Sequence, residues 1–171
     1  MYDIMKQQPV IVWNFDQTLF DPITKMLIPG AKSALEYTKN AGYKNLLYGQ
    51  SKRPDTLRSL IHETGIAPYF TDIFITKEKD VKEIFAFVKS YTQVVYNSFL
   101  VSNDIREDGA LGNILGVRTI WFKYGSFKHD LPREYHEEPV ATVETFSELK
   151  SLIHPVKKKF DIKICQEIYK Q

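Results

Sequence analysis

The sequence contains a single cysteine, Cys165, so no disulfide can form within the chain. No apolar run approaches the roughly 20 residues that a membrane-spanning helix requires. The N-terminus also lacks the basic and then apolar pattern of a secretory signal. From these absences we expect a soluble protein in a reducing, cytoplasmic setting.

An excess of one charge is also missing. The formal net charge is +2 in a chain in which 26% of the residues are charged, so the global charge indicates neither a nucleic acid nor a membrane as partner. A chain of 171 residues that is 43% hydrophobic can bury one core. We therefore expect a single domain over residues 1–171, with its core at about residues 9–153. The basic tail, residues 155–171, is expected to be a solvated helix.

Apolar runs typical of strands alternate with segments of helical spacing. Residues 10–13 are continuously apolar, as in a strand that is covered on both faces. Further strands are expected at residues 45–49, 72–76, 98–102, 118–122 and 141–143. Helices are expected over residues 31–41, 54–64, 81–88, 110–115 and 145–153, the last opened by a capping box. Repeated strand and helix units predict a doubly wound, Rossmann-like α/β fold, in which helices cover both faces of a parallel sheet in three layers.

Polar side chains follow several of these strands. In an open parallel sheet with the first strand at its centre, ligands bind beyond the carboxyl ends of the strands, where the winding reverses. The polar residues that the sequence places at this edge are Asn14, Asp16, Thr18, Ser51, Lys77, Lys79, Asp104 and Asp108. We expect them to converge on one crevice.

At these positions the sequence resembles the haloacid dehalogenase superfamily of phosphatases. The stretch VWNFDQTLF is similar to motif I, a hydrophobic strand followed by D-x-D-x-T, with Asn14 at the first Asp. LLYGQS resembles motif II, whose strand ends in Ser or Thr, here Ser51. VSNDIREDGALGNILGVRTIWF resembles motif IV, in which two acids four residues apart, Asp104 and Asp108, follow a strand. The likeness runs from about residue 10 to residue 122 and implies a phosphatase of this fold.

The resemblance also implies a magnesium site. Mg²⁺ prefers a hard oxygen octahedron with several waters and one or two carboxylates. Asn14 through its side-chain oxygen, Asp104, Asp108 through water, and the backbone carbonyl of Asp16 would supply the protein ligands. The carboxyl group of Asp16 would then remain free as general acid and base, which requires a raised pKa.

The phosphate oxygens need donors as charge spreads over them during transfer. Ser51 and one lysine would supply these donors. Lys79 has the spacing that suits motif III, while Lys77 and Lys82 remain alternatives.

Asn14 departs from the family at the nucleophile. The first Asp of motif I attacks phosphorus and becomes an aspartyl phosphate, whereas an amide oxygen carries no negative charge and is a poor nucleophile. Three interpretations stay open: an engineered variant, a natural relative that has lost turnover, or a different register in which another group reacts. A nucleophile at Asp16 fits worst, because it leaves Thr18 out of place. Gln17 and Asn103, where many relatives have Gly, favour a natural divergent protein.

Each residue also fits a simpler role. Asp16 and Thr18 fit a turn after a strand, and Asp108 fits an ordinary helix N-cap. That interpretation needs several coincidences at one edge of the sheet, so we favour the Mg²⁺-dependent phosphatase. The alternative function is a non-catalytic phosphate-binding or metal-binding module with the same fold.

Both gaps that hold cap insertions in this superfamily are short here, so no cap domain fits. An open crevice suits a large phosphorylated substrate, such as a phosphoprotein or a nucleic-acid end. It equally suits a site that a second copy of the chain completes. The aperiodic segment 123–139 is placed where it can border the site.

Overall fold

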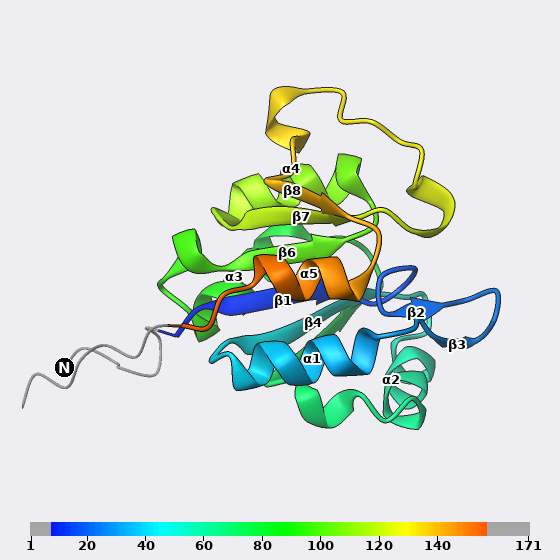
Figure 1. The fold of residues 1–171 in the computed structure, drawn as a ribbon. Helices are drawn as coiled ribbons and strands as arrows, with labels where there is room; N and C mark the ends of the chain where they lie inside the picture. The colour runs from blue at the N-terminus through cyan, green and yellow to red at the C-terminus, as the bar shows by residue number, and fades with distance from the viewer. Residues whose placement is uncertain (1–7, 157–171) are drawn as a thin grey trace, which may run out of the picture.

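A computed structural model describes residues 8–156. Its central feature is a six-stranded sheet with strand order β5-β4-β1-β6-β7-β8, in which every neighbouring pair is parallel (Figure 1). The strands are β1 (Val10–Asn14), β4 (Lys44–Gln50), β5 (Asp72–Thr76), β6 (Phe99–Ser102), β7 (Arg118–Phe122) and β8 (Ala141–Val143). The expected doubly wound α/β fold is confirmed, with the first strand at the centre and β6 beside it.

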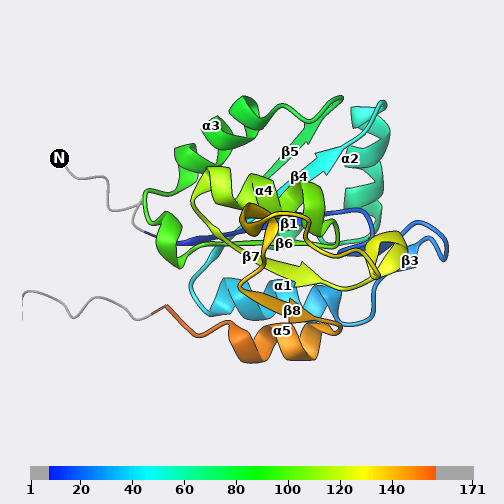
Figure 2. The same cartoon turned by 90° about the horizontal axis from the view of Figure 1, so that it is seen from above.

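Helices cover both faces of this sheet. The helices are α1 (Ala31–Asn40), α2 (Pro54–Glu63), α3 (Val81–Tyr91), α4 (Ile105–Leu115) and α5 (Phe146–Leu152). Figure 2 shows α1 and α5 on one side of the sheet and α3 and α4 on the other. Two separate hydrophobic clusters correspond to these two faces, and α2 contributes Ile61 to the cluster of α1 and α5. Short 3₁₀ helices lie at Ala67–Tyr69, Val95–Asn97, Gly125–Phe127 and Tyr135–Glu137.

The first strand is buried because it lies between these two layers. Val10, Ile11, Val12 and Trp13 are completely inaccessible to solvent, as the continuous apolar run of a central parallel strand requires. The indole nitrogen of Trp13 donates to Asn45 Oδ1 at 3.0 Å, so its one polar atom is satisfied inside the core. β1 is thus a rigid support for the residues at its carboxyl end.

The segments between the strands are short. A hairpin of β2 (Phe20–Asp21) and β3 (Met26–Leu27) precedes α1, and one or two helices fill each later connection. Within residues 8–156, no separate domain is inserted between β1 and β6. The carboxyl edge of the sheet is therefore bordered by the hairpin, by loops and by the first turns of α2 and α4. No helix in this part of the chain is long and apolar enough to cross a membrane.

The start of α4 differs from the prediction. The helix begins at Ile105 and not near residue 110, because Asp104 caps it and accepts from the backbone nitrogen of Glu107. Asp108 therefore lies within the helix, and the N-cap role considered for it is wrong.

The predicted C-terminal helix lies mostly outside the described residues, which end at Val156. This last residue donates its backbone N–H to the carbonyl of Ala41 at 2.8 Å. The chain is therefore still attached to the end of α1 where the description stops.

Candidate active site

A pocket of about 510 Å³ lies at the carboxyl ends of the central strands. The sequence-predicted residues that line it are Asn14, Asp16, Ser51, Lys77, Lys79, Asp104 and Asp108. Lys82, the weakest choice for the phosphate-binding lysine, is not among the lining residues. Residues from four separate loops thus meet at one edge of the sheet, as the topology predicts for an open α/β sheet.

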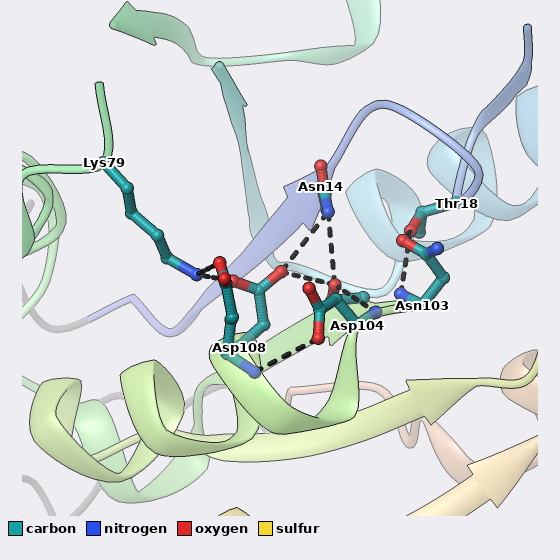
Figure 3. A network of polar contacts seen from close by, with 8 residues as sticks. Asn14, Thr18, Lys79, Asn103, Asp104 and Asp108 are labelled. Carbon is teal, nitrogen blue, oxygen red and sulfur yellow. Dashed lines mark hydrogen bonds and ion pairs between the residues drawn. The ribbon is translucent and has the colours of Figure 1, made fainter. Parts of the chain in front are cut away.

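A polar network joins Asn14 to Asp108 at the floor of this pocket. The side-chain nitrogen of Asn14 donates to Ser102 Oγ at 3.2 Å and to Asp108 Oδ2 at 3.3 Å. Ser102 also donates its hydroxyl to the same oxygen of Asp108. Figure 3 shows the nitrogen of Asn14 directed toward Asp108 and its oxygen directed away from this network. The amide oxygen is therefore left available to a ligand.

Lys79 balances the buried charge of Asp108. Asp108 is only 2% exposed, and its Oδ1 lies 2.6 Å from the ammonium of Lys79. Glu107 approaches the same ammonium at 3.3 Å from the solvent side. Burial alone would lower the pKa of Lys79, but the two carboxylates outweigh it and raise the pKa above its usual value. Lys79 is therefore a firmly charged group whose position is fixed by Asp108.

Asp104 lies one helical turn before Asp108. Its Oδ1 accepts from the backbone nitrogen of Glu107 at 3.1 Å, and its own backbone nitrogen donates to Ser102 Oγ at 3.1 Å. Burial raises the pKa of Asp104 above its usual value; the hydrogen bond from Glu107 opposes this, and the charge of Asp108 adds to it. A half-buried carboxylate of this kind is stabilised in its charged form by a cation.

Asp16 follows β1 at the exposed side of the pocket. Partial desolvation raises its pKa; a hydrogen bond from the Gln17 side chain opposes the shift, and the negative charge of Asp21 adds to it. The net direction is upward, which is the direction required of a group that donates a proton near neutral pH. Gln17, the next residue, has φ of 53°, in the left-handed region that favours glycine.

The loops after β1 and β6 are held together by Thr18. This residue is fully buried, and its hydroxyl oxygen accepts from the backbone nitrogen of Asn103 at 3.0 Å. The indole nitrogen of Trp121 donates to the carbonyl of Asn103 at 3.0 Å. Thr18 therefore has a structural role that fixes the distance between Asp16 and Asp104, in addition to any turn preference.

The hydroxyl proton of Ser51 can still be donated to a ligand. Its backbone nitrogen donates to the carbonyl of Thr76 at 2.9 Å, and its hydroxyl oxygen accepts from the backbone nitrogen of Arg53 at 3.0 Å. The second contact is the turn role considered for Ser51, but an accepting hydroxyl can still donate its own proton. The geometry is therefore compatible with both roles.

Several residues of the site were not found by sequence reasoning. Ser102 connects Asn14, Asp104 and Asp108, yet in the sequence it reads as the end of an apolar strand. Its position directly at the strand end, two residues before an acid, was the available signal. Phe127 also lines the pocket, so the segment 123–139 does border the site as expected, but no residue within it was singled out by sequence reasoning.

The donors at this edge can be compared with the needs of Mg²⁺. Among residues 8–156 there is no group of three or more His, Cys, Asp or Glu side chains that could hold a metal ion. The available oxygens are the Asn14 amide, the Asp104 carboxylate and backbone carbonyls, which fit an ion that takes few carboxylates and keeps several waters. Both oxygens of Asp108 already accept hydrogen bonds, so this residue fits a ligand role only through water.

Comparison with known proteins adds information about the fold. No protein-family model and no curated protein matches the chain. Among solved structures, D,D-heptose 1,7-bisphosphate phosphatase from B. bronchiseptica, complexed with magnesium and phosphate, is similar with a TM-score of 0.67 and 13% identity, covering 84% of this chain and 97% of that chain. An uncharacterized protein from Listeria monocytogenes serotype 4b has a TM-score of 0.67 and 17% identity, with 84% and 96% covered.

A third similar structure is a HAD phosphatase from Thermococcus onnurineus, with a TM-score of 0.57, 19% identity, and coverage of 76% of this chain and 60% of that chain. These similarities show that the chain shares the fold of these structures, one of which is a HAD phosphatase. At such low identities they establish the fold, while the chemistry has to be argued from the site itself.

Proposed function

We propose that this chain has the site of a Mg²⁺-dependent phosphatase that acts on phosphomonoesters, with turnover impaired because Asn14 occupies the nucleophile position. The observation that carries the proposal is the convergence of Asn14, Asp16, Lys79 and Asp104 on one pocket at the carboxyl edge of the sheet. These residues lie at the carboxyl ends of β1, β5 and β6, and all except Asn14 have the chemical type that phosphoryl transfer requires.

In the proposed arrangement a phosphate group lies over Asn14. Lys79 and the hydroxyl of Ser51 hold its oxygens, and Asp104 contributes to a cation site beside it. Mg²⁺ bound there would offset the negative charge of the phosphate oxygens. Asp16 protonates the leaving oxygen and later accepts a proton from water, a role that agrees with the upward direction of its pKa.

An Asp at position 14 would complete this chemistry. Its carboxylate would attack phosphorus and form an aspartyl phosphate, which water then hydrolyses. The amide of Asn14 keeps nearly the same shape and leaves its oxygen available, so the chain is expected to bind phosphate without forming that intermediate. The same substitution is compatible with a natural loss of turnover or with an engineered change.

The test is the turnover of p-nitrophenyl phosphate by Asn14→Asp in the presence of Mg²⁺. We expect release of p-nitrophenol that disappears when Mg²⁺ is chelated and when Asp16→Asn is added to the same chain. The unsubstituted chain, with Asn14, is the matched control. Turnover by Asn14→Asp no faster than by this control would refute the phosphatase proposal.

A second candidate function is a non-catalytic phosphate-binding module. The observation that favours it is the hydrogen bonding of Asn14, whose amide nitrogen satisfies Asp108 and Ser102 as a carboxylate could not. Calorimetric titration of the wild-type chain with inorganic phosphate and with phenyl phosphate, with and without Mg²⁺, tests it. The absence of heat changes under all four conditions would exclude this role.

A further inference from the structure

One wall of the pocket comes from the segment after β7. Phe127 lines the pocket and is 37% exposed, and it belongs to the 3₁₀ turn Gly125–Phe127. Two contacts hold this turn against the loop that follows β1. The side-chain oxygen of Gln17 accepts from the backbone nitrogen of Ser126 at 2.6 Å, and the hydroxyl of Tyr124 donates to Asp21 Oδ2 at 3.1 Å.

The backbone conformations of Gln17 and Gly125 both favour this contact. Gln17 adopts φ of 53°, which costs free energy in most residues other than glycine and asparagine. Gly125 adopts φ of 68°, and a Cβ placed on it would collide with the side-chain oxygen of Gln17. A glycine at position 17 would remove the backbone cost but also the contact with Ser126. Gln17 adopts this conformation despite its cost, which indicates that the hydrogen bond from Ser126 to its side chain has a structural or functional role.

The pocket is lined by apolar side chains and by polar ones, which include Gln50, Lys52 and Glu107. The floor contains the carboxylates, Asn14 and Lys79, where the phosphate group is proposed to lie. The apolar lining residues are Phe15, Phe20, Pro22, Leu57, Leu60 and Phe127. Among these, Phe127 is the one supplied by the segment after β7, and the residue before it, Ser126, makes the contact with Gln17.

We propose that Gln17 positions Phe127 as a specificity wall, so that the pocket prefers phosphomonoesters whose leaving group carries an aromatic or apolar ring. This inference rests on the proposed phosphatase function and deepens it. A ring that leaves the phosphate group toward Phe127 contacts the apolar face of that side chain, whereas a leaving group without a ring leaves this face exposed to water. Gln17 acts through Phe127 and is a positioning residue, and Phe127 is the residue that touches the leaving group.

The first measurement concerns the contact alone and needs no activity. Amide hydrogen exchange at Ser126 is followed by NMR in the wild-type chain and in Gln17→Asn, because asparagine tolerates the left-handed backbone but is too short to reach Ser126. We expect exchange about tenfold faster in the variant, as for the loss of one hydrogen bond. The matched control is Lys25→Asn, since Lys25 is exposed and also has positive φ, 56°. Unchanged exchange in Gln17→Asn would refute the positioning role.

The second measurement concerns specificity. In the Asn14→Asp background, kcat/KM is measured for phenyl phosphate and for glycerol 3-phosphate. We expect Phe127→Ala and Gln17→Asn each to lower the ratio of the two values by about tenfold, mainly through KM for phenyl phosphate. Tyr135→Ala, which removes a 92% exposed ring of the same segment, should leave the ratio unchanged.

The outcomes separate this inference from the proposed function. Turnover of both esters with a ratio that Phe127→Ala does not change would overturn the specificity wall and leave the phosphatase proposal intact. If Asn14→Asp turns over neither ester, the dissociation constants of phenyl phosphate and inorganic phosphate for the Asn14 chain replace the rates. A preference for phenyl phosphate that Phe127→Ala abolishes then supports the wall, and equal binding of the two overturns it. No binding of either would overturn the proposed site and the wall together.

Discussion

The side-chain nitrogen of Asn14 lies 3.3 Å from Oδ2 of Asp108 and donates a hydrogen bond to it. Asp108 is almost completely buried, so each donor around its carboxylate offsets the cost of removing its charge from water. Lys79 supplies the opposite charge on one side, and Ser102 and Asn14 supply neutral donors on the other. Asn14 therefore helps to stabilise the buried charge of Asp108, and it also occupies the position of the proposed nucleophile.

The first prediction follows from this contact. Asn14→Asp places a second carboxylate within hydrogen-bond distance of Asp108 and removes a donor, so without Mg²⁺ we expect the free energy of unfolding to fall by about 1 to 3 kcal/mol. Millimolar Mg²⁺ should restore much of the loss, because a cation offsets the added charge. Thermal unfolding with Mg²⁺ and with a chelator measures both effects.

The wild-type chain and Asn113→Asp are the controls for this experiment. Asn113 is exposed on α4, so its substitution adds the same charge away from the pocket. A stability of Asn14→Asp that equals the wild-type value in chelator would contradict the prediction. A stabilisation of Asn14→Asp by Mg²⁺ that is no larger than that of Asn113→Asp would also contradict the prediction.

The second prediction separates Lys79 from Lys77. Lys79→Met leaves the buried charge of Asp108 without its cation, and we expect the free energy of unfolding to fall by about 2 to 4 kcal/mol. Lys77→Met removes an exposed ammonium and should change stability by less than about 0.5 kcal/mol. Urea unfolding of the two variants at one pH provides the comparison. Equal losses would show that Asp108 is compensated by other groups.

The third prediction concerns the contact of α4 with the segment after β7. A Cβ placed on Gly109 would lie 2.5 Å from the backbone oxygen of Glu137 and 3.0 Å from its Cα, so the backbone would have to move. We expect Gly109→Ala to destabilise the protein by about 1 to 3 kcal/mol, although alanine is favoured over glycine in a helix by about 1 kcal/mol. Asn113→Ala in the same helix is exposed and serves as the control. If Gly109→Ala did not change the stability, the backbone around Glu137 would be able to move away at little cost in free energy.

Most of the fold could be predicted because the local signals agree with the tertiary structure. The run of residues 10–13 is buried on both faces, and the capping box of Thr145 and Glu148 opens α5 as expected. The start of α4 was missed because three charged residues, Arg106, Glu107 and Asp108, follow Ile105 in its first turn, so the apolar periodicity is clear only from the second turn. The first residue of α4 is instead determined by Asp104, whose side chain caps the helix by accepting from the backbone nitrogen of Glu107.

For the site, the topology explains what sequence reasoning could find. Residues directly after parallel strands must lie at one edge, and this placed Asn14, Asp16 and Asp104 in a common pocket. Phe127 could not be found in this way, because it does not follow a strand directly and the neighbouring contact joins Gln17 and Ser126, which are distant in sequence. No periodic or motif signal encodes such a contact.

The last prediction concerns the attachment of α3, whose preceding loop carries Lys79. The hydroxyl of Tyr91 donates to Asp72 Oδ2 at 2.5 Å, and this bond to a carboxylate is the main reason why the pKa of Tyr91 is raised to about 12. The raised value means that folding favours the neutral phenol. The stabilisation is therefore complete below the pKa of an unfolded tyrosine, about 10, and is lost as the pH rises through about 12.

Tyr91→Phe removes this hydrogen bond and should lower the free energy of unfolding at pH 7 by about 1 kcal/mol, a modest value because the pair is only partly buried. The difference between the wild-type chain and the variant should stay constant up to pH 10 and shrink above it. Denaturant unfolding at a series of pH values measures the difference, and ultraviolet absorption should assign a tyrosinate step near pH 12 to Tyr91. Tyr96→Phe, which removes the hydroxyl of an exposed ring, controls for the loss of one phenol from the absorbance. A difference that grows with pH would show that the hydroxyl of Tyr91 does not donate to Asp72, and that α3 is held against β5 by packing alone.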